Sequence, residues 1–202
     1  MFTGIITDIG RIVGVEERGD QRLTIACGYD MASVDLGASI ACSGACLTVV
    51  EKGPDWFAVD ISAESISRTA PGMWQKDRRL NLERAMKLGE ELGGHIVTGH
   101  VDGIGRISGL RDEGDSIRLT VTAGPDVAPY IAPKGSIALD GISLTVNSVE
   151  DHGAEVSFGL NIIPHTAAVT TFDDLAIGRD LNIEIDILAR YLGRMEQYRA
   201  RR

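Results

Sequence analysis

Two short segments of the chain carry polar side chains whose spacing could serve a ligand. Cys46 is followed two residues later by Thr48, and Ser143 is followed two residues later by Thr145. Residues two apart on a β-strand point to the same face, so each pair would present its polar groups to one ligand. A glycine two residues before each pair would allow the backbone to approach that ligand closely. The pattern suits a flat ring with a polyhydroxyl tail, but hydroxyls bonded to the local backbone would give the same pattern.

Two ionisable residues distinguish the later half of the sequence from the earlier half. His100 follows Gly99 where the earlier half has Ile5, and an imidazole can exchange protons near neutral pH. Asp186 ends the segment 182–186, whereas the corresponding segment of the earlier half, which starts at Asn81, continues into Arg84. We therefore treat His100 and Asp186 as candidate proton-transfer residues. The competing interpretations are a structural histidine and a helix N-cap.

The cysteines and histidines do not form a recognisable metal or redox site. Cys27, Cys42 and Cys46 lack C-x-x-C spacing, so we expect reduced thiols, with the first two as small buried side chains. His95 and His100 are five residues apart, which is not the spacing of a helical zinc pair. The glycine-rich stretch after His95 matches neither a phosphate loop nor a dinucleotide motif. The sequence thus predicts no metal and no cofactor.

Composition narrows the class of partner. The 202 residues are 44% hydrophobic, enough for a packed core, and their formal net charge of −9 would repel nucleic acid. No apolar run approaches the roughly 20 residues of a membrane span, and the opening Met1-Phe2-Thr3-Gly4 lacks the charged start of a signal peptide. We expect a cytoplasmic protein with no nucleic-acid or membrane partner.

The elements that must position these residues occur twice in the chain. Thr3 corresponds to Thr98, an offset of 95 residues that is too long for a solenoid repeat. The clearest matching segments are 3–14 with 98–109, 39–49 with 136–146, and 81–83 with 182–184. The sequence therefore predicts two domains of similar fold, residues 1–95 and 96–187, joined through a short linker at 87–94.

Each half is expected to be a small all-β barrel. The 24 glycines and 5% aromatic residues favour short strands joined by tight turns. The runs expected as strands in the first half are 4–15, 22–27, 39–42, 46–50, 56–61 and 80–85. Closing six strands into a barrel would remove the exposed edges of such a small sheet.

The last segment, residues 188–202, is predicted to be an amphipathic helix. Leu188, Leu192, Met195 and Tyr198 fall at helical spacing after Asp186. The apolar stripe must pack on its own barrel or on another subunit, and we favour the subunit contact.

Taken together, the motifs resemble those of the riboflavin synthase family. They are the opening residues 1–5, the strand 44–49, the stretches 93–103 and 134–146, and the segments 164–166 and 182–186. The resemblance implies two tandem, similar six-stranded closed β-barrels plus a C-terminal α-helix, assembled as a homotrimer. It also implies an active site between the first barrel of one subunit and the second barrel of its neighbour.

The reaction implied by the resemblance is a dismutation of two molecules of 6,7-dimethyl-8-ribityllumazine. One molecule donates a four-carbon unit to the other, which yields riboflavin and 5-amino-6-ribitylaminouracil without a cofactor. Such an enzyme is a transferase of riboflavin biosynthesis. Association with lumazine synthase is a further candidate partnership that the sequence leaves open.

The resemblance also assigns residues to the site. The implied catalytic residues are Cys46, His100, Lys134, Ser143 and Asp186. The implied substrate contacts, divided between two ligand pockets, are Gly4, Ile5, Ile6, Ser39, Cys46, Leu47, Thr48, Asp60, Ile61, Ser62, Ala63, Glu64, Ser65, Gly99, His100, Val101, Lys134, Ser143, Leu144, Thr145, Ile162, Ile163, Pro164, His165, Thr166 and Ala167, with Phe2 as a further candidate.

The sequence departs from the family pattern at one position. Ser43 stands where the family more often has Asn, and we expect this change to affect local ligand geometry.

The alternative function is a non-catalytic lumazine- or flavin-binding protein of the same fold. Such a protein should have lost polar ligands in one barrel, whereas both polar pairs are present here.

Overall fold

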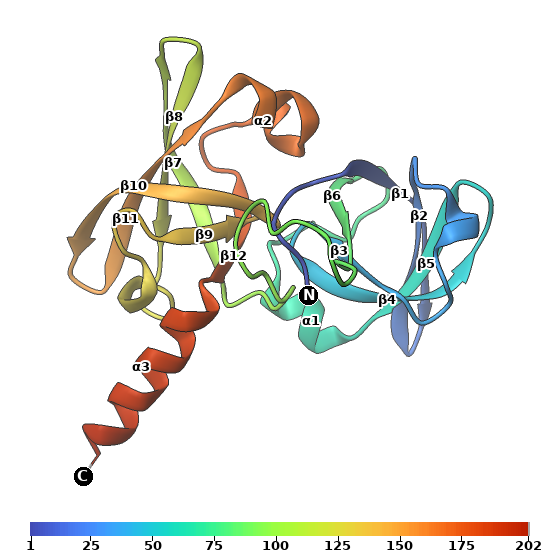
Figure 1. Cartoon of the computed structure of the whole chain (residues 1–202), viewed down its shortest axis with the longest axis horizontal. Helices are drawn as coiled ribbons and strands as arrows, with labels where there is room; N and C mark the ends of the chain where they lie inside the picture. The colour runs from blue at the N-terminus through green and yellow to red at the C-terminus, as the bar shows by residue number, and fades with distance from the viewer. Residues whose placement is uncertain (202) are drawn as a thin grey trace.

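The computed structural model describes residues 1–201 as two β-barrels that lie side by side, with a helix projecting away from them (Figure 1). Each barrel is closed and has six antiparallel strands in the same order, which confirms the predicted fold class. The first barrel consists of β1 (Asp8–Arg18), β2 (Asp20–Ala26), β3 (Ser39–Cys42), β4 (Ala45–Lys52), β5 (Trp56–Ile61) and β6 (Arg79–Arg84). The second consists of β7 (Gly103–Glu113), β8 (Ser116–Ala123), β9 (Ser136–Leu139), β10 (Ile142–His152), β11 (Glu155–Ile162) and β12 (Asp180–Ile185).

Short helical segments occupy equivalent places in the two barrels. The helix α1 (Ala63–Arg68) follows β5, and α2 (Pro164–Val169) follows β11. The 3₁₀ turns η1 (Met31–Ser33) and η2 (Ala128–Tyr130) are equivalent in the same way, whereas η3 (Thr171–Asp174) has no 3₁₀ counterpart in the described first barrel. The duplication seen in the sequence is therefore a duplication of the whole barrel with its attached turns.

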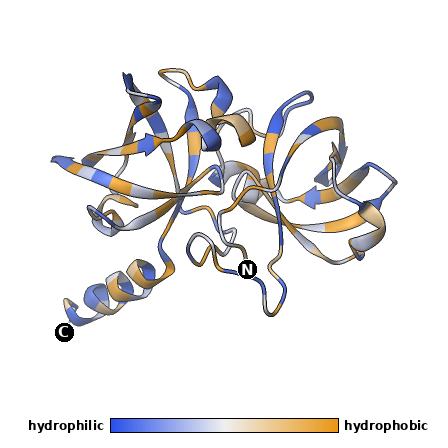
Figure 2. Ribbon diagram, turned by 45° about the horizontal axis from the view of Figure 1, so that its top comes forward, coloured by the Kyte–Doolittle hydropathy of each residue, from blue (hydrophilic) through white to orange (hydrophobic). Residues whose placement is uncertain are grey.

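Alternation of apolar and polar side chains fills each barrel and leaves a polar outer face. On β2, Leu23 and Ile25 are fully buried in the barrel, whereas Arg22 points to the outer face and is partly exposed. On β8, Leu119 and Val121 are buried in the same way. The alternation is visible along the strands in Figure 2. Each barrel has a hydrophobic core of its own, so each outer face is carried by a separate rigid scaffold.

The first predicted strand begins later than expected, because residues 4–6 leave the first barrel, whereas the Thr7 amide already donates to the Leu82 carbonyl of β6. Strand β1 starts at Asp8, and the segment before it lies against the second barrel. The amide of Ser143 on β10 donates to the carbonyl of Gly4 over 2.8 Å, and Ile6 packs on the second core. The N-terminus accordingly lies between the two barrels in Figure 1.

The start of the second half makes the reciprocal contact. The amide of Cys46 on β4 donates to the carbonyl of Gly99 over 2.8 Å, and Val101 packs on the first core. The two halves thus exchange their leading segments. An antiparallel bridge between Phe2 and Val97 joins these segments at the centre of the exchange.

A buried glutamate in each half holds the exchanged segment. Glu83 on β6 accepts from the Thr3 amide at 2.6 Å and from the Gly4 amide at 2.9 Å. Glu184 on β12 accepts from the backbone amides of residues 98, 99 and 100 at 2.6, 2.9 and 3.0 Å. Burial raises the pKa of the Glu83 carboxyl, and the hydroxyl and amides that donate to it act in the opposite direction.

Two asparagines join the barrels across a buried seam. Asn81 Nδ2 donates to the Asp140 carbonyl over 2.9 Å, and Asn182 Nδ2 donates to the Ser43 carbonyl over 2.8 Å. Ser43 is only 2% exposed, and its hydroxyl accepts from the Asn81 amide. Ser43, which differs from the usual family residue, therefore lies in the seam and not on a ligand surface. Its effect on ligand geometry would act through the way the two barrels pack together.

The glycines that precede the two polar pairs also lie in this seam. A methyl group on Gly44 would lie 2.9 Å from the amide nitrogen of Gly141, and one on Gly141 would lie 2.8 Å from that of Gly44. Our expectation that these glycines open the backbone to a ligand was wrong, because they allow the two barrels to approach each other.

The predicted C-terminal helix is present as α3 (Ile187–Arg199), which ends three residues before the predicted end at residue 202; residue 202 lies outside the described residues. Arg190 on this helix pairs with Asp102 at 2.7 Å, which ties the helix to the loop that follows His100. Leu188, Leu192 and Met195 are each more than half exposed, and Figure 2 shows apolar residues along the projecting helix. Within residues 1–201, no helix combines the length and apolar character needed to cross a membrane.

Candidate functional site

Ser39, Cys46 and Thr48 define a first ligand surface on the outer face of β3 and β4. Cys46 is half-buried and Thr48 is exposed on β4, and Ser39 on β3 is the direct strand partner of Thr48. A methyl group on Gly99 would lie 2.5 Å from Cys46 Cβ, so only glycine fits where the second half crosses this surface. The exposed His100 directly follows Gly99, whose carbonyl accepts from the Cys46 amide, so His100 leaves the crossing at this surface.

Residues 60–65 border this surface at the end of β5. Ser62 is the N-cap of α1, with its hydroxyl accepting from the Ser65 amide at 3.2 Å, and Ala63 and Glu64 are exposed on the helix. Arg22 donates to both carboxylate oxygens of Asp60, at 2.8 and 3.0 Å. The Arg22 guanidinium lowers the pKa of the Asp60 carboxyl. Asp60 is therefore held as a charged partner of an arginine.

The second ligand surface is the equivalent face of β10. Ser143 is half-buried and Thr145 is exposed on this strand. A methyl group on Gly4 would lie 2.5 Å from Ser143 Cβ, which repeats the close approach of Gly99 to Cys46. Ile5 is 46% exposed beside it. Each surface is thus completed by the leading segment of the other half.

The remaining contacts of the second surface come from α2 and from the turn before β9. Ile163 stands at the N-cap position of α2 and is exposed, as are Pro164 and His165, whereas Thr166 and Ala167 are half-buried. Lys134 is exposed, and its amide donates to the Val146 carbonyl over 2.7 Å.

Several of the residues assigned by resemblance have side chains that face a barrel interior. Leu47, Ile61, Leu144 and Ile162 belong to the two hydrophobic cores, so only their backbone can reach a ligand. Phe2 is 1% exposed and packs in the seam with Val97, which removes its side chain from either ligand surface.

Sequence reasoning missed His95 as a member of the second surface. Its Nδ1 lies 2.7 Å from Ser143 Oγ, while its Nε2 is buried and has no hydrogen-bond partner in residues 1–201. Burial lowers the pKa of His95, and the nearby Asp186 carboxylate acts against that shift. The Gly93-Gly94-His95 motif was the available signal, but its partner lies 48 residues away in the sequence.

Asp186 is the N-cap of α3, as the competing interpretation had it. Its Oδ1 accepts from the Leu188 amide at 2.8 Å. The capping oxygen leaves the second carboxylate oxygen available, and the carboxylate lies close enough to His95 to influence its protonation. Asp186 therefore belongs with His95 and Ser143, whereas His100 belongs with Cys46.

The other cysteines are structural. Cys42 is fully buried in the first core and Cys27 packs against it, and all three cysteines are free thiols. Burial raises the pKa of both the Cys27 and the Cys42 thiol. Among the described residues 1–201, no cluster of three or more His, Cys, Asp or Glu side chains is arranged to hold a metal ion.

Comparisons with known proteins agree with the duplicated architecture. The Lumazine binding domain family matches the chain twice, at residues 3–85 and 98–186. A riboflavin synthase of Brucella abortus (strain 2308) is 50% identical over 98% of this chain and 99% of the relative. A riboflavin synthase of Bacillus subtilis (strain 168) is 36% identical over 96% of this chain and 89% of the relative.

Solved structures show the same fold. The crystal structure of LumP complexed with riboflavin has a TM-score of 0.81 and 25% identity, covering 92% of this chain and 99% of that chain. The structure of LumP complexed with 6,7-dimethyl-8-(1'-D-ribityl) lumazine has a TM-score of 0.79 at the same identity, covering 91% of this chain and 98% of that chain.

Proposed function

The chain belongs to the riboflavin synthase family, and we propose that its two ligand surfaces each bind one molecule of 6,7-dimethyl-8-ribityllumazine. The activity of that family is the dismutation of two such molecules to riboflavin and 5-amino-6-ribitylaminouracil. The observation that carries the proposal is the reciprocal exchange of leading segments, which completes two equivalent surfaces with intact polar pairs. Two equivalent surfaces suit a reaction between two copies of one compound.

The reaction requires three tasks of the protein. It must remove a proton from an acidic ring methyl, deliver a nucleophile to the partner ring, and hold the two rings face to face, so that orientation supplies much of the rate. We assign proton transfer to His100 on the first surface and to Asp186 on the second. Cys46 and Ser143 occupy equivalent places next to the rings.

Supporting roles fall to neighbouring groups. We assign contacts with ribityl hydroxyls to Ser39 and Thr48 on the first surface and to Thr145 and Lys134 on the second; Ser39 is the strand partner of Thr48. His95 is a positioning residue, because its 2.7 Å contact fixes the Ser143 hydroxyl and its own exposed surface is small.

We further propose a homotrimer in the cytoplasm, with α3 in the subunit contact. The exposed apolar side chains of α3 support the contact between subunits, and the three free cysteines support a reducing compartment. In this assembly the first surface of one subunit would face the second surface of its neighbour. Association with lumazine synthase is a separate proposal, and co-sedimentation of the two purified proteins tests it.

Purified protein mixed with 6,7-dimethyl-8-ribityllumazine alone should produce riboflavin fluorescence. One molecule of 5-amino-6-ribitylaminouracil should appear for each riboflavin, since every donor is converted to that product. Tight binding of lumazine with no fluorescence growth would instead favour the non-catalytic binding protein. The polar pairs and ionisable groups retained on both surfaces make that alternative the less favoured one.

A further inference from the structure

The outer faces of the two barrels carry different charges at equivalent positions. On each barrel a row of outward side chains crosses four strands, starting from the threonine of the ligand surface. The row on the first barrel is Thr48, Asp60, Arg22 and Glu16, and the row on the second is Thr145, Asn161, Arg118 and Arg111. The second barrel thus has an amide and a guanidinium where the first has two carboxylates.

A third carboxylate is also missing from the second barrel. Glu51 on β4 pairs with Ala58, and the equivalent pair on the second barrel is Ser148 with Gly159. At these five positions the first barrel has one cation and three anions, whereas the second has two cations and no anion. The sign of the local charge is therefore reversed in a chain whose net charge is −9.

The arginines of the two rows are neutralised to different extents. On the first barrel, Arg22 contacts two carboxylates, Asp60 at 2.8 Å and Glu51 at 3.3 Å. On the second barrel one carboxylate, Glu113, serves two arginines, Arg118 at 2.7 Å and Arg111 at 3.7 Å. The second row consequently retains positive charge that the first row lacks.

Lys134 adds a third cation beside this row. Its backbone is left-handed, with φ of 66°, and the equivalent residue of the first barrel is Gly37 with φ of 86°. A lysine is strained in a conformation that suits glycine, so its presence there indicates a use for its ammonium group. Within residues 1–201 the Lys134 side chain makes no hydrogen bond or ion pair.

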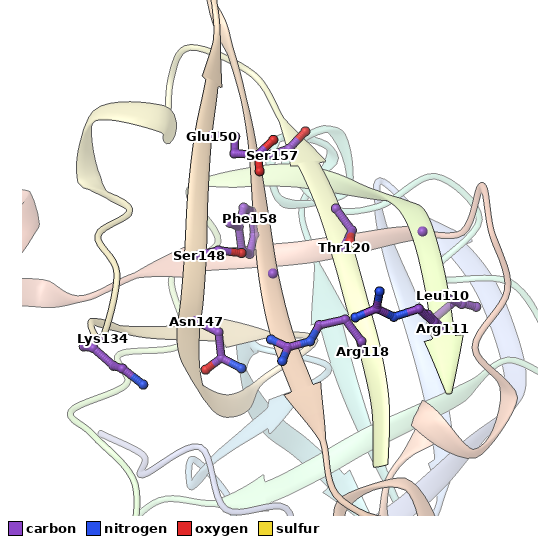
Figure 3. A pocket seen from close by; sticks show the side chains of 12 residues that line it. Leu110, Arg111, Arg118, Thr120, Lys134, Asn147, Ser148, Glu150, Ser157 and Phe158 are labelled. Atoms are coloured by element: carbon purple, nitrogen blue, oxygen red, sulfur yellow. The ribbon is translucent and has the colours of Figure 1, made fainter. Parts of the chain in front are cut away.

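These cations line one hollow of about 780 Å³ on the outside of the second barrel. Figure 3 shows Lys134, Asn147, Arg118 and Arg111 in a band across the strands, with Ser148 and Glu150 among the other lining side chains. Gly109 and Gly159 also line the hollow, and their lack of side chains leaves it open. Glu150 is the one carboxylate among the lining residues.

The hollow continues from the second ligand surface. Lys134 hydrogen-bonds to Val146, the residue after Thr145, and Asn161 stands between Thr145 and Arg118 in the row. Two strand spacings separate Thr145 from Arg118, about 10 Å. An extended five-carbon polyol with a terminal phosphate is of comparable length. Asn161 Oδ1, between these two positions, is buried and has no hydrogen-bond partner in residues 1–201.

We propose that this hollow binds the phosphate of a flavin phosphorylated at the end of its ribityl chain, such as flavin mononucleotide. The inference rests on the proposed function, because the flavin ring would lie on the second ligand surface. Guanidinium groups bind phosphate oxygens through charge-assisted hydrogen bonds, and the Lys134 ammonium supplies a further charge. A phosphorylated flavin bound in this way competes with lumazine and inhibits turnover.

The test compares flavin mononucleotide with riboflavin as competitors of lumazine turnover and as ligands in flavin fluorescence titrations. For the unmodified protein, we expect flavin mononucleotide to bind about five- to tenfold more tightly than riboflavin, with the ratio falling at high salt. Arg118→Gln and Arg111→Glu, the second of which restores the acidic residue of the first barrel, should each bring the ratio close to one. Both variants should bind riboflavin as before.

The matched control is Arg106→Gln, which removes an exposed arginine from the same strand, β7, outside the hollow. It should keep the preference for flavin mononucleotide. A ratio near one in the unmodified protein overturns the inference, as does a preference that survives both substitutions in the hollow. Binding of inorganic phosphate to the hollow with no advantage for flavin mononucleotide also overturns it. Riboflavin production by the unmodified protein in the same assay shows that such a failure leaves the proposed function intact.

Discussion

The ionisable groups of the two ligand surfaces are not equivalent, although the backbone around them is. On the first surface, the exposed His100 follows the glycine that bonds to Cys46; on the second, the buried His95 contacts Ser143. Burial lowers the pKa of His95, which favours its neutral form, and a neutral imidazole can orient a hydroxyl through Nδ1. An exposed imidazole is free to meet a substrate. The two surfaces are therefore suited to different steps on two identical molecules.

His100→Ala should slow turnover far more than it weakens ligand binding. Loss of a general acid or base typically costs a factor of about 100 or more in kcat, whereas the ring contacts of the surface remain. Single-turnover kinetics and lumazine titration measure the two effects separately. His152→Ala, at the exposed end of β10, is the control and should change neither. Equal losses of binding and turnover in His100→Ala would assign this residue to recognition.

His95 should make the stability of the fold depend on pH. Its pKa is lower in the folded protein than the ordinary value of 6.5, so the unfolded chain takes up a proton first as the pH falls. Stability should therefore rise with pH up to about 6.5 and change little from this residue above that value. Urea unfolding at a series of pH values measures the slope, which should be shallower in His95→Gln. An identical slope in the variant would show that His95 does not titrate differently in the folded protein.

The site residues that sequence reasoning found share a property that a linear pattern can reveal. The pairs Cys46 with Thr48 and Ser143 with Thr145 are two apart on single strands, so their common face follows from strand geometry. His95 could not be found in this way. Its partner is remote in sequence, and its own repeat counterpart would fall before residue 1, which removes any comparison between the halves.

At the scale of elements, the leading segments and their glutamate anchors decide how the surfaces form. An extended segment has the same sequence pattern whichever barrel it contacts, so the pattern alone cannot separate residues 4–6 from the first strand. The repeated Asn-x-Glu motif was visible in the sequence, but its role was not. In the structure, Asn81 and Asn182 hold the barrels together, while Glu83 and Glu184 hold the exchanged segments.

Glu184→Gln should destabilise the protein and disturb the first ligand surface. The two carboxylate oxygens accept from three backbone amides and the Thr98 hydroxyl. A glutamine side chain has one oxygen acceptor and an NH₂ donor, so it cannot accept all four hydrogen bonds. We expect a loss of about 2–3 kcal/mol in the free energy of unfolding, measured by denaturant titration. Glu83→Gln should cost a similar amount but disturb the second surface. Glu17→Gln, exposed on β1, is the control. A neutral effect of Glu184→Gln would argue against the anchoring role.

At the scale of the whole molecule, the two ligand surfaces lie on different barrels, while the proposed reaction needs them to meet. Each barrel has its own core, and a buried seam of asparagine bonds and back-to-back glycines fixes the pair as one unit. A homotrimer would solve the problem by bringing surfaces of different subunits together, and the exposed stripe of α3 offers a contact for it. The sequence predicted the barrels and the helix because each depends on local periodicity. How the barrels meet depends on contacts between residues far apart in the chain.

If the active site lies between subunits, two differently blocked variants should restore each other. Thr48→Trp fills the first ligand surface and Thr145→Trp fills the second, and both positions are exposed on outer faces, so the barrels should fold. Each variant alone should be inactive. Co-expressed in equal amounts, they should recover about one quarter of the unmodified activity, because random assembly pairs an open first surface with an open second surface at that frequency.

Adding Leu192→Glu on α3 to both variants should abolish the recovery together with the trimer, as measured by analytical ultracentrifugation. A mixture no more active than the separate variants, in trimers shown to contain both chains, would place the reaction within a single chain.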